Sequence, residues 1–118
     1  MSRRVYWRLK DMKGAIEEIQ KLLDSNSRSV LDTDPAVRAA FERFLEILSE
    51  ASRHVPENLR KKYPDIPWRQ VADLGNVIRH IYHKIDLDAL WSTYENDLPK
   101  LETVVDSLLA EVTPPDVE

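Results

Sequence analysis

Glycine is nearly absent from this chain: Gly14 and Gly75 are the two glycines among its 118 residues. The tight turns of an all-β fold rely on glycine at positions with positive φ, so the composition argues against such a fold. A dinucleotide-binding fingerprint or a P-loop needs several glycines at fixed spacing, and two isolated glycines exclude both phosphate-binding loops. Cysteine is absent from the sequence, which excludes disulfides, thiolate zinc sites and cysteine nucleophiles.

Apolar residues recur at helical spacing through most of the chain, between prolines and short polar stretches. Asp34 and Asp86 are predicted N-caps, Pro35 and Pro67 suit the first turn of a helix, and Pro99 is expected to break or kink the last helical stretch. The predicted helices cover about residues 5–23, 35–54, 57–63, 67–84 and 86–109. We therefore predict an all-α fold, an antiparallel bundle of four to five helices.

Length and charge set the expected class of protein. A chain of 118 residues predicts a single domain, here over residues 1–112, followed by a frayed tail at 113–118. The net charge of −4 gives no global reason to expect binding to duplex DNA. No apolar run approaches the roughly 20 residues of a transmembrane helix, and the N-terminal segment is too charged for a signal peptide. A cytoplasmic protein without membrane contact is the expectation.

The predicted helix at 67–84 has two different faces. Its apolar side is predicted to face the core and consists of Val71, Leu74, Val77, Ile78, Ile81 and Ile85. Its opposite side consists of Arg69, Asp73, Asn76, His80 and His83. Solvated helix faces usually carry Lys and Glu, whereas this one carries His, Asn and Asp, which form specific hydrogen bonds. A polar surface, a subunit interface and a functional site are all compatible with this pattern.

Other uses of these histidines are weaker hypotheses. His80 and His83 are spaced to bind one metal ion, with Asp73 and Asp86 as further ligands, but no second histidine pair supports the site, and no metal or other cofactor is expected. A Ser-His-Asp triad lacks any nucleophile-elbow motif in this sequence.

Aromatic and basic clusters also have simple structural interpretations. Trp7, Trp68 and Trp91 are most simply explained by packing in the core or at helix ends. The run 60–62, Arg-Lys-Lys, is either a phosphate contact or a solvated turn.

Several motifs together resemble the HepT-like branch of the HEPN domains. They are Glu46-Ile47-Leu48-Ser49-Glu50-Ala51, Ile66-Pro67-Trp68-Arg69, Asn76, His80, Tyr82, Asp86-Leu87-Asp88, Trp91 and Asp97-Leu98-Pro99. The resemblance implies an all-helical, HEPN-like domain that forms a homodimer through the motif-bearing helix. Typical members of this family are ribonuclease toxins, which are paired with a small nucleotidyltransferase antitoxin of the MNT type.

The chain departs from the family motif, Arg-x4-His-x-Tyr, at its first position. His80 and Tyr82 match the last part of the motif, and Asn76 matches the Asn that commonly follows the Arg, but the Arg position falls on Gly75. Arg79 lies one turn after Gly75. Because helical side chains lean toward the N-terminus, the Arg79 guanidinium could lie above Gly75 and replace the missing cation. An exposed Arg79 without such a role is the simpler alternative.

The resemblance implies metal-independent RNA cleavage, with His80 moving a proton and a cation stabilising the phosphate. Loss of such a cation typically lowers the rate about 10²–10³-fold, so the chain is expected to be a toxin with a weakened endoribonuclease activity. Tyr82 is implied as the residue to which the antitoxin attaches AMP. The alternatives are a non-catalytic partner or nucleotide-binding subunit of a nucleotidyltransferase, and an unrelated helical interaction protein.

Overall fold

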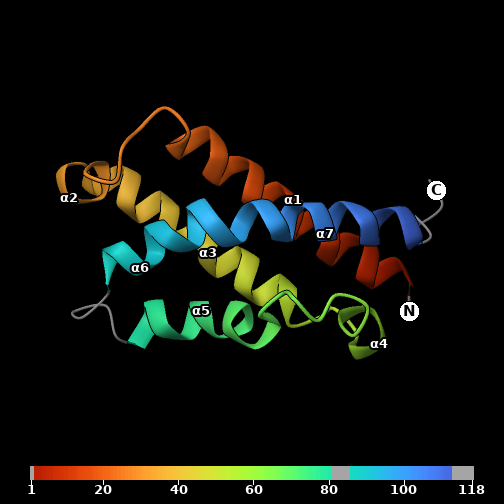
Figure 1. Ribbon diagram of the computed structural model, residues 1–118. Helices are drawn as coiled ribbons and strands as arrows, with labels where there is room; N and C mark the ends of the chain where they lie inside the picture. The colour runs from red at the N-terminus through yellow and green to blue at the C-terminus, as the bar shows by residue number, and fades with distance from the viewer. Residues whose placement is uncertain (1, 81–85, 113–118) are drawn as a thin grey trace.

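The computed structural model describes residues 2–80 and 86–112, and these residues form helices and short connections without a strand. Four long helical rods run alternately in opposite directions, as the colour sequence in Figure 1 shows. The elements are α1 (Ser2–Leu23), α2 (Val30–Thr33), α3 (Pro35–Ser52), α4 (Glu57–Arg60), α5 (Trp68–His80), α6 (Leu87–Ser92), the π-helical turn η2 (Thr93–Asp97) and α7 (Leu98–Glu111). The predicted all-α bundle is confirmed.

The core lies where α3 and α7 pack against α1. The side chains that fill it come from the apolar stripes of these three helices, and each is at most 2% exposed: Leu9, Met12, Ile16, Ile19, Phe41, Leu45, Leu48, Leu101, Val105 and Leu108. α5 packs against α3 on the other side, so α3 lies between α1 and α5 (Figure 1). α5 is thus a peripheral helix with a large exposed face.

The two predicted N-caps are confirmed. Oδ1 of Asp34 accepts hydrogen bonds from the backbone N–H of Ala36 and Val37, at 3.1 and 3.2 Å. Oδ1 of Asp86 accepts in the same way at the start of α6, from residues 88 and 89 at 3.0 and 3.1 Å. Each carboxylate satisfies donors that the first turn of a helix leaves without partners, which fixes where α3 and α6 begin.

Pro99 acts as the sequence predicts, through a π-helical turn. Proline has no N–H and its ring would clash with a carbonyl of the preceding turn, so a regular α-helix cannot run through it. The Leu98 N–H donates instead to the Thr93 carbonyl, five residues earlier, and Pro99 stands in the first turn of α7. π-helical turns of this kind are frequent at functional sites.

Two features of the chain, α2 and the end of α4, differ from the sequence-based expectation. α2 was not expected, because a single helical turn is too short to show a periodic pattern; it buries Leu31. α4 ends at Arg60 rather than near Tyr63, since the residue before Pro64 is disfavoured in helical conformation. Residues 81–85, which include the end of the predicted helix at 67–84, and residues 113–118, the predicted frayed tail, lie outside the described residues. Among the described helices, none combines the length and apolar character that crossing a bilayer requires.

Candidate active site on α5

The start of α5 is fixed by Trp68. Its side chain is 9% exposed, and its indole N–H donates to the Tyr63 carbonyl at 3.1 Å. The Pro67 carbonyl accepts the first intrahelical hydrogen bond, from Val71 N–H at 3.0 Å. Trp68 is therefore packed in the core, as its sequence context indicates, and orients the helix that follows.

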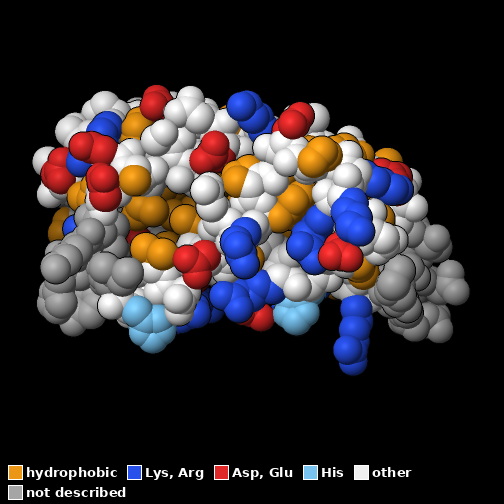
Figure 2. All heavy atoms as spheres, turned by 60° about the horizontal axis from the view of Figure 1, so that its bottom comes forward, with side chains coloured by type: hydrophobic (Ala, Val, Ile, Leu, Met, Phe, Trp, Pro, Cys, Tyr) orange, Lys and Arg blue, Asp and Glu red, His pale blue; other side chains and the backbone are white. Residues whose placement is uncertain are grey.

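The polar face that the sequence predicts on α5 is present. Arg69, Asp73, Asn76 and His80 are exposed, whereas Val71 and Ile78 on the opposite side are buried. His and basic side chains gather along the lower side of the molecule in Figure 2, the side on which α5 lies. Asn76 and His80 are four residues apart, so the two side chains share one face of the helix.

Gly75 is buried at the contact between α5 and α3, and Ser49 of α3 lies directly against it. The Gly75 N–H donates to Ser49 Oγ at 3.0 Å, and the Ser49 hydroxyl donates to the Ala72 carbonyl at 2.9 Å. Nε of Arg53 donates to the same carbonyl at 3.1 Å. These bonds hold α3 and α5 close together, and a Cβ atom at position 75 would stand 3.3 Å from Ser49 Oγ.

The Arg79 side chain folds back toward the N-terminus of α5 and covers Gly75. Its Nη1 atom lies 3.1 Å from the point where a Cβ of residue 75 would stand. The same atom is 3.8 Å from Oε2 of Glu46, a half-buried carboxylate of α3. The Arg79 side chain is half exposed, so an anion can reach it. The orientation that helix geometry predicts for Arg79 is thus present.

His80 is the last described residue of α5, and its side chain is exposed. No hydrogen bond joins it to Asn76 or Arg79 in the residues that the structure describes. Tyr82 and His83, the remaining residues of the motif and of the metal hypothesis, lie outside the described residues. In residues 2–80 and 86–112, no three His, Asp or Glu side chains are grouped to hold a metal ion, and Asp86 serves as a helix cap.

The other residues singled out by sequence have structural partners, with one exception. Arg60 donates to the Val55 carbonyl, Lys61 pairs with Glu57, and Lys62 pairs with Glu111, so the 60–62 run is engaged within the molecule. Trp91 packs against Tyr94, with ring centroids 4.8 Å apart.

The exception is Trp7. It was expected in the core or at a helix end, but it is 56% exposed, because it lies on the side of α1 opposite Val5 and Leu9. The expectation for Trp7 was wrong. The helical period of α1 places this position on the outer side of the helix, but the apolar character of tryptophan suggested a buried position.

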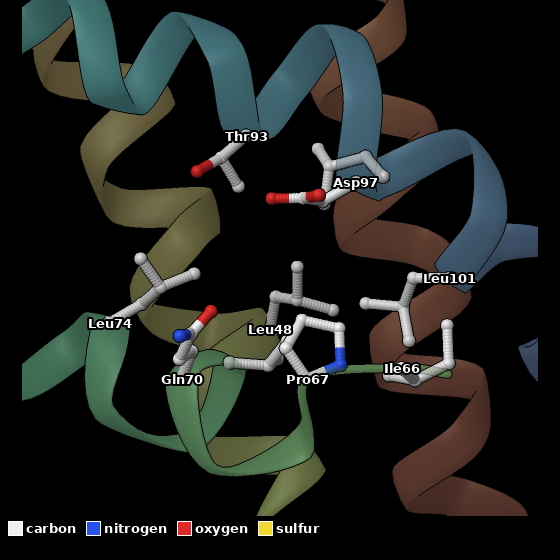
Figure 3. A pocket seen from close by; sticks show the side chains of 10 residues that line it. Leu48, Ile66, Pro67, Gln70, Leu74, Thr93, Asp97 and Leu101 are labelled. Atoms are coloured by element: carbon white, nitrogen blue, oxygen red, sulfur yellow. The ribbon is translucent and has the colours of Figure 1, made fainter. Parts of the chain in front are cut away.

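A pocket that the sequence did not predict lies between α5 and the junction of η2 and α7. Its volume is about 130 Å³, and it is lined by Leu48, Ile66, Pro67, Gln70, Val71, Leu74, Thr93, Asp97, Leu98 and Leu101. Figure 3 shows Thr93 and the Asp97 carboxylate above an apolar floor that includes Leu48, with Gln70 at the side of α5. Residues from α3, α5, η2 and α7 meet here, which no local sequence pattern could indicate.

The chain matches a family described as Ribonuclease HepT-like over residues 12–108. It is 33% identical over 94 residues to "Probable ribonuclease HepT" of Thermococcus cleftensis, covering 80% of this chain and 86% of that protein. It is 39% identical over 70 residues to a "Putative RNase" of Methanocaldococcus jannaschii, covering 59% and 64% of the two chains. A "Putative RNase" of Caldanaerobacter subterraneus is 33% identical over 76 residues, covering 64% and 68%. No solved structure matches the chain significantly.

Fold and sequence therefore define an all-helical domain of the HEPN type. The chain belongs to the HepT-like ribonuclease family.

Proposed function

We propose that this protein is a toxin that cleaves RNA without a metal ion, with Arg79 in place of the motif arginine at Gly75. The observation that carries the proposal is the Arg79 guanidinium over Gly75, on the helix that also presents Asn76 and His80. A guanidinium is always charged, and its fork of N–H donors fits phosphate oxygens. Arg79, one helical turn after the motif position, can therefore supply the same positive charge to a phosphate.

The reaction this site supports is attack of a ribose 2′-hydroxyl on the adjacent phosphorus. A bond forms between the 2′-oxygen and phosphorus, and the bond to the 5′-oxygen breaks, which leaves a 2′,3′-cyclic phosphate and a free 5′-hydroxyl. Imidazole can take the 2′-proton or deliver a proton to the leaving oxygen near neutral pH, which is the role we assign to His80. Arg79 would stabilise the negative charge that builds up on the phosphate, and Asn76 would orient the same group.

We infer that the active unit is a homodimer formed through α5. α5 packs against α3, and its Asn76- and His80-bearing face is exposed. A two-fold interface on this face would place two copies of the site in one cleft. Light scattering at micromolar concentration tests the dimer, and a monomer would contradict it.

The partner we propose is a nucleotidyltransferase of the MNT type that attaches AMP to Tyr82. Two other tyrosines are already engaged, since the Tyr63 hydroxyl donates to Glu111 at 3.2 Å and the Tyr94 hydroxyl donates to Asp24. Intact mass spectrometry after incubation with the partner, ATP and Mg²⁺ should show AMP addition that Tyr82→Phe abolishes. Addition that persists in this variant would refute the assignment.

A second candidate function is a non-catalytic subunit of the same nucleotidyltransferase. The observation that favours it is the Glu46 carboxylate 3.8 Å from Arg79 Nη1, which already balances the charge of the guanidinium. In that case the protein would bind its partner but not cleave RNA.

Cleavage of a labelled RNA in the presence of a chelator separates the two functions. We expect slow cleavage by the wild type, and a loss of about 10²–10³-fold in both Arg79→Ala and His80→Ala. Lys100→Ala, which removes an exposed charge from α7, is the matched control and should cleave normally. Gly75→Arg should add little if Arg79 is the cation, whereas rescue of an inactive wild type by Gly75→Arg would show that nothing replaced it. Cleavage unchanged in both alanine variants would remove the nuclease from α5.

A further inference from the structure

Trp7 is the most unusual surface residue of the described structure. It is 56% exposed, whereas the other large apolar side chains in residues 4–80 and 86–112 are buried or half buried. The neighbouring Tyr6 ring is roughly perpendicular to it, with centroids 5.2 Å apart and planes at 80°, so the two rings form a T-shaped pair rather than a face-to-face stack. Exposed apolar surface of this size commonly marks a binding site.

Trp7 forms one wall of a surface hollow between the first turns of α1 and the segment after α3. The hollow is lined by Arg4, Val5, Trp7, Arg8, His54 and Pro56 and has a volume of about 660 Å³. This volume lies within the roughly 300–1,000 Å³ of ligand-binding pockets. We call this feature the Trp7 hollow.

The charge of the Trp7 hollow is opposite to that of the whole chain. Arg4 and Arg8 contribute two guanidinium groups, and no carboxylate is among the six lining residues, although the net charge of the protein is −4. The exposed carboxylate of Glu50 pairs with His54 at 3.1 Å, so the two guanidinium groups carry the positive charge of the hollow. A flat aromatic face beside guanidinium groups is what an unpaired nucleotide needs, since the base stacks and the phosphate is paired.

The Trp7 hollow is connected to α5 through α3. Nε2 of His54 is 3.1 Å from Oε2 of Glu50. That hydrogen bond, with weaker attraction from Arg53 and Arg8, lowers the pKa of Glu50 below its ordinary value. Arg53 in turn donates to the Ala72 carbonyl of α5. The side chains at the end of α3 thus reach the backbone of α5 at Ala72, on the side of α5 that packs against α3.

We propose that the Trp7 hollow binds one unpaired nucleotide of an RNA strand, with the base stacked on Trp7 and the phosphate contacted by Arg4 and Arg8. The inference rests on the proposed function, because it gives the same RNA strand a second contact, at the end of the bundle where α1 begins and away from the end of α5 that carries His80 (Figure 1). Single strands are favoured over duplexes, since only an unpaired base exposes its face for stacking. The α1 residues of the hollow precede the residues that the family match covers, 12–108.

The test measures binding separately from cleavage. The probe is a fluorescein-labelled 2′-O-methyl oligouridylate of twelve nucleotides, which lacks the attacking hydroxyl, and the full chain is titrated by fluorescence anisotropy. Loss of a base–aromatic stack predicts that Trp7→Ala weakens binding about 5- to 140-fold, while Trp7→Phe, which keeps a ring, weakens it less. Arg8→Ala should also lower the dependence of binding on salt by about one charge. Lys21→Ala, at the far end of α1, is the charge control and should bind as the wild type.

The outcomes distinguish this inference from the proposed function. Binding of Trp7→Ala within twofold of the wild type would overturn the inference, while His80-dependent cleavage of a normal RNA in the same preparation would leave the proposed function intact. If Trp7→Ala changes the oligomeric state in light scattering but not the affinity for the strand, the hollow is an interface between copies of the chain, and the inference is again overturned. The inference is supported if Trp7→Ala binds the probe more weakly and also raises KM for normal RNA while kcat stays unchanged.

Discussion

The two glycines provide a matched pair of substitutions that tests the packing around Gly75. Both lie inside helices, where replacement by alanine normally stabilises a protein by about 1 kcal/mol. A Cβ at Gly14 would meet no atom within 4 Å, so Gly14→Ala should gain the full amount. For a domain of about this size, that gain corresponds to a rise in Tm of about 4 °C.

Gly75→Ala should gain much less stability, because the new Cβ atom would come close to the side chains of Arg79 and Ser49. The contact with Arg79 Nη1 at 3.1 Å is relieved cheaply, since the end of a flexible side chain can move. The contact with Ser49 Oγ at 3.3 Å is more costly, because this oxygen is held by hydrogen bonds with Gly75 N–H and the Ala72 carbonyl. Losing one such bond costs about 1 kcal/mol, which cancels the propensity gain.

Chemical denaturation of both variants measures the difference directly. We expect Gly75→Ala to be at least about 1 kcal/mol less favourable than Gly14→Ala, with reduced RNA cleavage because the Arg79 guanidinium is displaced. The double variant with Arg79→Ala should keep the stability difference, since Ser49 causes it. Equal stabilisation by both alanines would refute the close packing of Gly75, and normal cleavage by Gly75→Ala would refute the importance of the Arg79 position.

Two further predictions concern pH. Burial, and then the hydrogen bond to Asp24, raise the pKa of Tyr94 to about 12. An unfolded tyrosine ionises near pH 10, so the stability of the protein should fall as the pH rises from 10 to 12. Absorbance at 295 nm should show a titration step of Tyr94 at high pH, which Tyr94→Phe removes. Asp24→Asn should lower the pH of this step only in part, because burial also raises the pKa. Hydrogen bonds from Lys13 and Gln20 lower the pKa of Glu102, so its contribution is present above pH 4.5 and lost as the pH falls below it. Glu102→Gln should make urea unfolding less sensitive to pH between 5 and 3, by up to about 1 kcal/mol, and an unchanged pH profile would contradict the pairing.

Local signals in the sequence predicted the parts of the fold that depend on neighbouring residues. Asp34 and Asp86 cap helices because a carboxylate can reach N–H groups two and three residues later, which is a property of the chain alone. The position of Pro99 predicts an interruption for the same reason, although the sequence does not say that the interruption is a π-helical turn. The apolar stripe of α5 is equally local, and Val71 and Ile78 are buried as predicted.

Features that depend on other elements were not predictable. The pocket beside η2 requires four helical segments to meet, and the Trp7 hollow requires α1 to lie next to the end of α3. The partner of Gly75 is Ser49, which is 26 residues away in sequence. The hydrophobicity of Trp7 led to a wrong prediction, since a large apolar residue looks the same in a sequence whether its side chain faces the core or the solvent.

The contact between Gly75, Ser49 and Arg79 shows why the missing motif arginine cannot be judged from the motif alone. The absence of a side chain at position 75 lets Ser49 reach two backbone groups of α5 and leaves room for the Arg79 guanidinium. Arg79 follows Gly75 by four positions, which correspond to about 6 Å along a helix, roughly the reach of an arginine side chain that leans toward the N-terminus. Glycine at position 75 thus lacks the cation of the family motif, and it also leaves the space that the Arg79 guanidinium occupies. The Glu46 carboxylate, 3.8 Å away, is too distant for a tight hydrogen bond, and half of the Arg79 side chain is exposed, so its guanidinium is accessible to a phosphate while Glu46 stays beside it.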